Sequence, residues 1–342
     1  MALVVGLGLA ATLLLGEPKP GQAQPTPADT SVPRTPDGKP DLQGFWDAAT
    51  LTPLERPPEA RGHASLTAEQ AAAIERAAAQ RRERGVRPSD PNRSAPPVGG
   101  VDAAGGVGGY NGFWVDRGSS VTSINGQART SLVVDPPDGR VPPLTPEGRK
   151  RVAERRELAE VYDDVEVRPL GERCLMGFGS TAGPPALPVM YNNIKQIVQT
   201  PDHVMILNEM VHDARIVRMN ARHLPPSVRK WMGDSIGRWE GDTLVVETTN
   251  FTDKTRFRGS GEHLKVVERF TRLDARTLLY QFTVDDPTAW TRPWSGEYTW
   301  AWSDQPLYEY ACHEANYSLE GILRGARRQE AEEPARPPGR PR

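Results

Sequence analysis

The stretch of residues 194–302 constrains the fold most, because short segments with apolar residues at every second position alternate there with turn residues. Its first two segments meet at Pro201-Asp202, a pair suited to the central positions of a type I turn. Closing a hairpin there pairs Thr200 with His203. Further reversals are predicted near His212-Asp213, at Glu240-Gly241 and at Asp274-Ala275. The pattern predicts an antiparallel meander of hairpins.

A two-residue turn at Asp274-Ala275 sets the register of the longest predicted hairpin, in which Glu268 faces Gln281 and Phe270 faces Leu279. In that register both faces of the sheet mix apolar and charged side chains. A flat sheet over a conventional core would separate them more cleanly, so the mixture favours a curved or closed sheet with a lined interior. We therefore expect a mainly β protein, an antiparallel meander that forms a barrel or strongly curved sheet, lipocalin-like in outline.

Two short helices and a proline-rich N-terminal arm are expected around this sheet. Thr67 to Gln70 form a capping-box signature, and Thr145-Pro146 begins a second helix that runs to about Glu160. Frequent proline excludes helix over residues 24–66. Composition divides the chain into a signal peptide (1–23), a proline- and glycine-rich arm with one capped helix (24–112), a β-rich domain (113–323) and a disordered tail (324–342).

The N-terminus predicts export. Residues 2–15 are an apolar run too short to span a bilayer, and small residues at 21–23 provide a cleavage site, which together are typical of a secretory signal. A buried N-terminal strand is the alternative. We expect a periplasmic or secreted protein with no membrane span in the mature chain. A net charge of −2 gives no reason to expect a nucleic-acid partner or an anionic membrane surface.

The chain has two cysteines, Cys174 and Cys312, which flank the predicted meander. In an oxidising compartment such a pair predicts a disulfide that ties the two ends of the meander together. Two buried free thiols, or a nucleophilic Cys312 beside His313, are the alternatives.

Five segments resemble a large family of exported bacterial proteins whose members are usually labelled hypothetical. They are DGKPDLQGFW (37–46), LVVDPPDGR (132–140), GDTLVVET (241–248), VERF (267–270) and YEYACHE (308–314). The resemblance covers roughly residues 34–326. It implies export, but no established activity, so it assigns no catalytic residue.

Carboxylates inside apolar strands are the first candidates for chemistry. Glu247 and Glu268 would have raised pKa values in a dry cavity and could then act as general acid or base, with His212 or Arg269 stabilising developing charge. Such a site needs neither a metal nor an organic cofactor, and we expect none. In the alternative interpretation these carboxylates face solvent and pair with arginine or lysine.

Aromatic residues near the end of the meander are candidates for ligand binding. Trp294, Tyr298 and Trp300 would line a cavity, with Glu209 and Gln281 as polar groups. Aromatic residues also fill cores and close barrel ends, so this alternative stays open.

These observations predict an exported β-barrel-like protein that binds a small molecule of unknown identity. Two alternatives remain. One is a cofactor-independent isomerase, lyase or hydrolase that uses the strand carboxylates. The other is a structural envelope protein with a filled interior and no pocket. The sequence indicates neither a ligand nor an oligomeric state.

Overall fold

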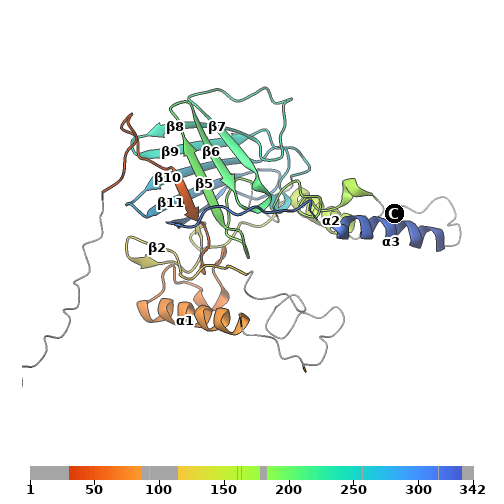
Figure 1. Ribbon diagram of the computed structural model, residues 1–342, viewed down its shortest axis with the longest axis horizontal. Helices are drawn as coiled ribbons and strands as arrows, with labels where there is room; N and C mark the ends of the chain where they lie inside the picture. The colour runs from red at the N-terminus through yellow and green to blue at the C-terminus, as the bar shows by residue number, and fades with distance from the viewer. Residues whose placement is uncertain are drawn as a thin grey trace, which may run out of the picture.

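The computed structural model describes residues 31–86, 92, 115–159, 161–162, 164–177, 183–255, 257–314 and 316–332. These residues form a closed, mostly antiparallel β-barrel with three α-helices outside it (Figure 1). The predicted barrel is confirmed. The predicted signal peptide, most of the glycine- and proline-rich segment after Gly85 and the chain beyond residue 332 lie outside the described residues.

Nine strands close the barrel, in the order β1-β5-β6-β7-β8-β9-β10-β11-β12, with β12 pairing back to β1. They are β1 (Gly44–Asp47), β5 (Ile194–Gln199), β6 (His203–Asn208), β7 (Ala214–Met219), β8 (Asp234–Glu240), β9 (Thr243–Thr249), β10 (Lys265–Arg272), β11 (Thr277–Asp285) and β12 (Trp294–Trp302). An odd number of strands cannot alternate in direction all the way around a closed barrel. The β7–β8 pair is parallel, and it resolves this conflict.

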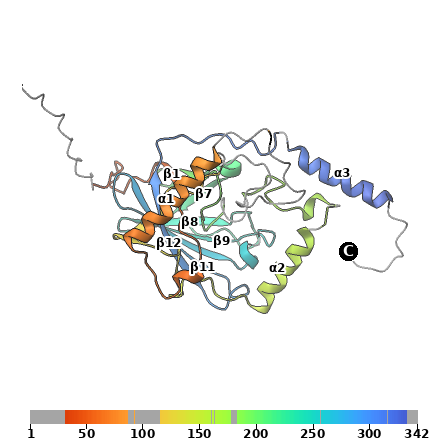
Figure 2. The same cartoon turned by 90° about the horizontal axis from the view of Figure 1, so that it is seen from below.

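Shorter elements surround the barrel. The strand β4 (Val133–Asp135) pairs with β12, and β2 (Ser123–Ile124) forms a small hairpin with β3 (Gln127–Ala128). The helices are α1 (Ala68–Gly85), α2 (Pro146–Ala159) and α3 (Tyr317–Glu332), with the 3₁₀ helices η1 (Pro58–Ala60), η3 (Val165–Val167), η4 (Met210–His212) and η5 (Phe257–Gly259). In Figures 1 and 2, α1 lies across one end of the barrel, and α3 projects from its side.

The predicted register of the β5–β6 hairpin is confirmed, since Val198 faces Met205. The predicted register of β10–β11 is wrong by one residue, because Phe270 faces Tyr280. The turn there has three residues rather than two. Leu273 N donates to Thr277 O, and the Asp274 carboxylate accepts a hydrogen bond within the turn. The β8–β9 turn is also displaced by one residue, to positions 241–242.

This register correction changes which side chains share a face. It brings Leu278, Tyr280 and Phe282 onto the same side of the sheet as Val266 and Phe270, and all five are buried. The apparent mixture of apolar and charged side chains on both faces, which favoured a barrel, therefore came largely from the wrong register. The barrel is closed all the same, and its inner face is consistently apolar apart from a few buried charges.

Aromatic rings fill the barrel interior. Tyr280 stacks on Trp300 with ring centroids 4.8 Å apart, and Phe270 lies 5.1 Å from Tyr280. Trp294 and Tyr298 are fully buried in the same cluster. Contacts at these distances stabilise the core beyond the area that they bury.

Residues 44–47 form a barrel strand instead of an arm laid against the barrel. β1 lies between β5 and β12 and closes the ring. Its Trp46 is fully buried and lies edge to face with Trp302, with ring centroids 5.4 Å apart. The apolar pair Phe45-Trp46 therefore completes the fold, although it is far from the meander in sequence.

The two α-helices predicted from capping signals are confirmed. Thr67 and Gln70 form the capping box of α1, and Thr145 Oγ1 accepts a hydrogen bond from Gly148 N in the first turn of α2. The prediction that the chain lacks structure after residue 323 is wrong as far as residue 332, because α3 continues to Glu332. Ion pairs between adjacent turns, such as Arg328 with Glu332, support this exposed helix.

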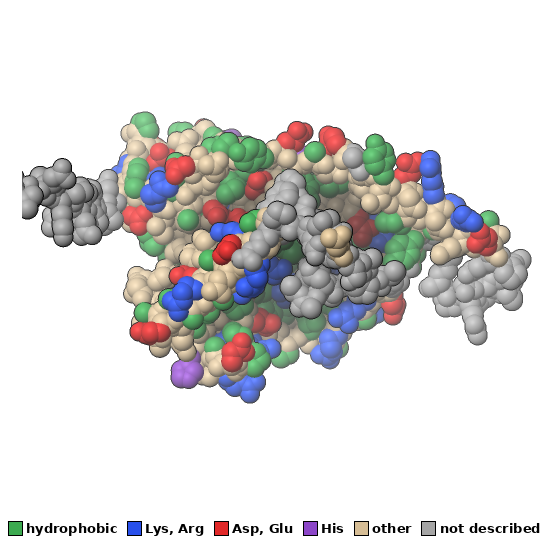
Figure 3. All heavy atoms as spheres, turned by 60° about the horizontal axis from the view of Figure 1, so that its bottom comes forward, with side chains coloured by type: hydrophobic (Ala, Val, Ile, Leu, Met, Phe, Trp, Pro, Cys, Tyr) green, Lys and Arg blue, Asp and Glu red, His purple; other side chains and the backbone are tan. Residues whose placement is uncertain are grey.

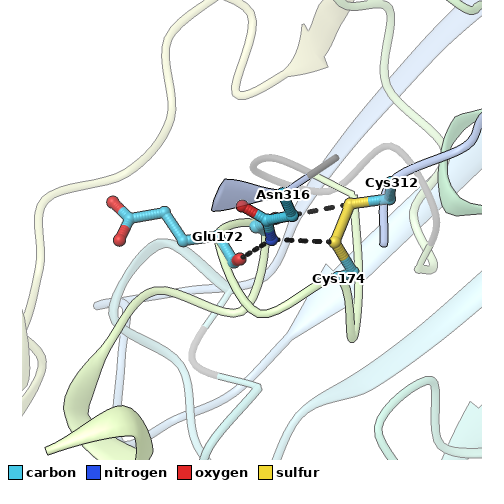
Figure 4. Close-up of a disulfide and its surroundings, with 5 residues drawn as sticks. Glu172, Cys174, Cys312 and Asn316 are labelled. Carbon is cyan, nitrogen blue, oxygen red and sulfur yellow. Dashed lines mark hydrogen bonds between the residues drawn. A yellow bond between two sulfur atoms is a disulfide. The ribbon is translucent and has the colours of Figure 1, made fainter. Parts of the chain in front are cut away.

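The predicted disulfide between Cys174 and Cys312 is present, with a Cα–Cα distance of 5.7 Å and a separation of 138 residues. It joins the segment before β5 to the segment after β12. Asn316 Nδ2 donates to Glu172 O at 3.0 Å and lies 3.6 Å from Cys174 Sγ (Figure 4).

In the part of the chain that the structure describes, no helix is both long enough and apolar enough to cross a membrane.

The two ends of the barrel differ. At one end, short turns join β5 to β6, β8 to β9 and β10 to β11. At the other end lie the long connections, including the one that carries η5 between β9 and β10 and the segment that leads into β5. Functional side chains in barrels are usually carried by long loops on a rigid scaffold, so this second end is the place to search for a site.

Candidate functional site

The structure does not bring the four predicted acid–base residues together. Glu268 points into the barrel and is fully buried, whereas Glu247 lies on the outer face of the neighbouring strand, opposite Val267. Arg269 is on the outer face and forms an ion pair with Glu240 at 2.8 Å. His212 lies in η4, beyond the end of β6. Their proposed catalytic roles stay predictions.

Glu268 belongs to a buried polar cluster in the barrel interior. Arg215, itself buried, donates to both of its carboxylate oxygens, and Tyr280 Oη donates to Glu268 Oε1 at 2.8 Å. Burial and the adjacent Glu268 charge raise the pKa of Tyr280 well above its ordinary value. Ala186 N donates to Tyr280 Oη, and Tyr298 Oη donates to Ala186 O. The segment around Ala186 therefore closes this end of the barrel interior.

Glu247 contributes to a charged network on the outer surface. Its carboxylate lies 2.8 Å from Lys265 Nζ and 3.3 Å from His223 Nε2. The hydrogen bond from Lys265 is the main reason that the pKa of Glu247 is lowered. His223 Nδ1 lies 3.0 Å from the buried Asp234. A carboxylate held in its charged form in this way is stabilised as an ion-pair partner and is a weak general base near neutral pH.

The predicted ligand-binding residues are also dispersed. Trp294, Tyr298 and Trp300 pack in the core, and the indole N–H groups of the two tryptophans have no hydrogen-bond partner among the described residues. Gln281 lies on the outer face, where it donates to Glu297 at 3.0 Å. Glu209 lies at the loop-bearing end and accepts a hydrogen bond from the backbone N–H of β5 at 3.1 Å. Their roles in ligand binding stay predictions.

A group of buried charges lies beside Glu209 at the loop-bearing end. Lys195 is fully buried, and burial followed by repulsion from Arg215 lowers its pKa to about 7. Burial also raises the pKa of Asp47 to about 6 and raises that of Glu209. Burying the positive charge of Lys195 is therefore unfavourable, and attraction to the carboxylates of Glu209 and Asp47 offsets part of this cost.

The loop-bearing end of the barrel holds a cavity of about 730 Å³, termed the arginine pocket here. Its walls come from the segment after β1, the segment before β5, α1, α2 and η5. Figure 3, which looks onto this end, shows blue Lys and Arg side chains near the middle of the face. The lining residues are Thr50, Leu51, Thr52, Pro53, Leu54, Arg81, Arg117, Arg155, Leu187, Pro188, Val189, Met190, Phe257 and Arg258. The set combines an apolar surface with four guanidinium groups.

Two of the arginines are placed by α1 and the segment beside it. Arg82 in α1 lies 3.6 Å from the Asp116 carboxylate. This contact holds the end of α1 against residues 116–118. Arg81, which precedes Arg82, and Arg117, which follows Asp116, both line the pocket. The helix buries no side chain of its own, so such polar contacts determine its position.

The other two arginines are placed by close contact between α2 and η5. Arg151 Nε donates to Gly259 O at 2.8 Å. A Cβ atom at Gly259 would lie 3.0 Å from Val152 Cγ2, and the residue has φ +95°, so glycine is required for this approach. Arg155 on α2 and Arg258 in η5 thereby face the same cavity.

Arg258 has an unusual environment. Its backbone is in the left-handed region (φ 49°, ψ 33°), which is uncommon for a residue other than glycine. The residue is exposed to solvent, yet many protein atoms surround its guanidinium. The resulting desolvation lowers the pKa of Arg258 from its ordinary value, and the nearby charge of Glu55 acts in the opposite direction. A strained residue that directs a charge into a pocket is typical of functional positions.

None of the four arginines was predicted from the sequence. They come from four separate segments, and only the fold brings them together. The chain has 42 basic and 44 acidic residues, so its overall charge conceals a local excess of either sign. No spacing between Arg81, Arg117, Arg155 and Arg258 would have identified them.

A second, smaller cavity of about 360 Å³ lies beside the disulfide, between residues 171–172 and the segment that leads into α3.

Comparisons of the chain with protein-family models, curated proteins and solved structures found no match. The functional interpretation therefore depends on the geometry described above. The resemblance to exported bacterial proteins stays a prediction.

Proposed function

We propose that the protein is an exported small-molecule-binding barrel, and that its ligand lies in the arginine pocket at the end of the barrel. The main support is the combination of size and lining. Ligand pockets typically enclose about 300–1,000 Å³ and pair an apolar surface with a few polar groups. The arginine pocket has about 730 Å³ and both kinds of surface.

The filled interior supports an end site over a site within the barrel. Aromatic rings occupy the interior, and the segment around Ala186 closes it through hydrogen bonds to Tyr280 and Tyr298. Leu187, the next residue, is part of the core and also lines the pocket. The pocket is thus formed on the outer side of the segment that closes the barrel.

The two carboxylates of the enzyme alternative do not form one site. Glu268 is neutralised by Arg215 in the interior, and Glu247 is paired with Lys265 on the opposite face of the barrel wall. The structural envelope alternative predicts a filled interior without a pocket; the interior is filled, but the end of the barrel holds the arginine pocket. A periplasmic or secreted location accords with the disulfide, which persists in oxidising compartments, and with the family resemblance.

A ligand screen with a pocket-filling variant tests this proposal. Ligands from a metabolite library that raise the melting temperature of the wild type should no longer do so for Leu51→Trp, because the indole would occupy the cavity. Leu273→Trp, at an exposed residue in the β10–β11 turn, is the matched control and should retain the response. Ligands that stabilise both variants equally, or a library without any stabilising compound, would refute a binding site here.

A further inference from the structure

We infer that the ligand of the arginine pocket is an amphipathic anion, with a carboxylate, phosphate or sulfate group bound by the arginines and an apolar body against the apolar lining residues. The inference rests on the proposed function and specifies its ligand class. It follows from the combination of arginine charge and apolar surface within one cavity.

Among the described residues that line the pocket, all charges are positive. These residues include four arginines and no Asp or Glu. Arg81, Arg117 and Arg258 form no ion pair with a carboxylate among the described residues. Arginine presents several N–H donors in a planar arrangement that matches carboxylate and phosphate oxygens, and such charge-assisted bonds are about twice as strong as neutral ones.

Nearby carboxylates are engaged elsewhere. Glu55 Oε1 accepts a hydrogen bond from Val141 N at 2.7 Å. The Glu55 charge still raises the pKa of Arg258, in opposition to desolvation. Asp116 lies 3.6 Å from the guanidinium of Arg82, and this arginine does not line the pocket. The positive charges of Arg81, Arg117 and Arg258 are therefore left for a bound anion.

The apolar wall excludes a simple inorganic anion as the best ligand. The apolar residues Leu51, Leu54, Leu187, Val189, Met190 and Phe257 line the cavity. Phe257 and Leu187 are buried and continue directly into the barrel core. Covering such a surface stabilises a complex in proportion to the apolar area removed from water, and a phosphate ion alone would leave it hydrated.

Arg258 and Arg117 are positioned before any ligand binds. The left-handed backbone of Arg258 is held between Phe257, which packs in the core, and Gly259, which contacts α2. Arg117 is steadied by a 3.4 Å contact between its guanidinium and Met190 Sδ. Groups that are already ordered lose less conformational entropy on binding, which favours affinity.

Isothermal titration with three probes tests the inference on the whole protein. Dodecanoate carries both features, dodecanol lacks the charge, and inorganic phosphate lacks the apolar chain. Below the micelle concentration and near neutral pH, dodecanoate should bind the wild type at least about tenfold more tightly than either of the others. It should not bind Leu51→Trp.

Charge-removing variants connect the binding to the pocket. Arg258→Gln and Arg117→Gln should each weaken dodecanoate binding by about tenfold, as expected for loss of a charge-assisted hydrogen bond. Arg222→Gln, an exposed arginine outside the pocket lining, is the matched control and should change it by less than about twofold. Two arginine variants are used so that a folding defect in one does not decide the result.

Each contrary outcome has a distinct meaning. Dodecanol that binds as tightly as dodecanoate, with binding lost in Leu51→Trp, would overturn the anionic ligand class and leave small-molecule binding intact. Phosphate that binds as tightly as dodecanoate would overturn the apolar requirement. Dodecanoate binding that is absent, or equal in all the arginine variants, would overturn the inference, and the metabolite screen would then decide the proposed function separately.

Discussion

Lys195 provides a quantitative test of the buried charges at the loop-bearing end of the barrel. It lies on β5 with its side chain fully buried, near Arg215, Glu209 and Asp47. Burial and the nearby Arg215 lower its pKa from 10.5 to about 7. Because the folded state binds fewer protons than the unfolded state between these two pH values, the free energy of unfolding should rise with pH in this window.

The size of the effect follows from the shift in pKa. At 1.36 kcal/mol per pKa unit, the difference between 10.5 and about 7 corresponds to about 5 kcal/mol of destabilisation, fully present below pH 7 and relieved as pH rises toward 10.5. Substitution Lys195→Met removes the titrating group and keeps an unbranched side chain of similar length. The free energy of unfolding of Lys195→Met minus that of the wild type should therefore decrease by about 3 kcal/mol between pH 6 and pH 9.

Urea unfolding of both proteins at pH 6 and pH 9, under non-reducing conditions, measures this difference. Lys150→Met, at a residue whose side chain is 69% exposed, is the matched control and should follow the wild type at both pH values. If the difference in free energy of unfolding between Lys195→Met and the wild type is the same at pH 6 and pH 9, the Lys195 side chain is not buried with a lowered pKa. The placement of β5 in the barrel would then be in doubt.

Two further predictions concern groups that hold the barrel together. Glu268→Gln leaves Arg215 buried without its counter-charge and should lower the free energy of unfolding by about 3–5 kcal/mol. Arg215→Met combined with Glu268→Met removes both charges and should lower it by less. An unchanged melting temperature in Glu268→Gln would contradict the buried pair. Cys174→Ser combined with Cys312→Ser should lower unfolding free energy by about 4–5 kcal/mol in the chain-entropy model, and equal stability in urea with and without the bridge would contradict that contribution.

Local sequence signals predicted the elements of this fold well. Alternating apolar residues identified most strands of the meander, and capping residues located the starts of α1 and α2. Errors arose where tertiary contacts decide the outcome. The three-residue turn after Leu273 shifted the register of β10–β11, and Trp46 became part of a barrel strand because β5 and β12 offer it an edge on each side.

The candidate site was much less predictable. Carboxylates in apolar strands looked alike in sequence, yet Glu268 faces the interior and Glu247 faces solvent, since neighbouring strands set the face of each. The cavity was predicted inside the barrel, but aromatic side chains fill the interior, and the arginine pocket lies at the barrel end. The arginine pocket depends on contacts between segments far apart in sequence, such as Arg151 with Gly259, and no local pattern encodes these contacts.

A crystal structure of the protein with terminally brominated dodecanoate tests the central claim most directly. We expect the anomalous signal of the bromine beside Phe257 and Leu54 in the arginine pocket, and the carboxylate within hydrogen-bond distance of Arg258 or Arg117. A bromine located in the smaller cavity beside the disulfide, or a pocket that remains empty at saturating ligand, would contradict the account.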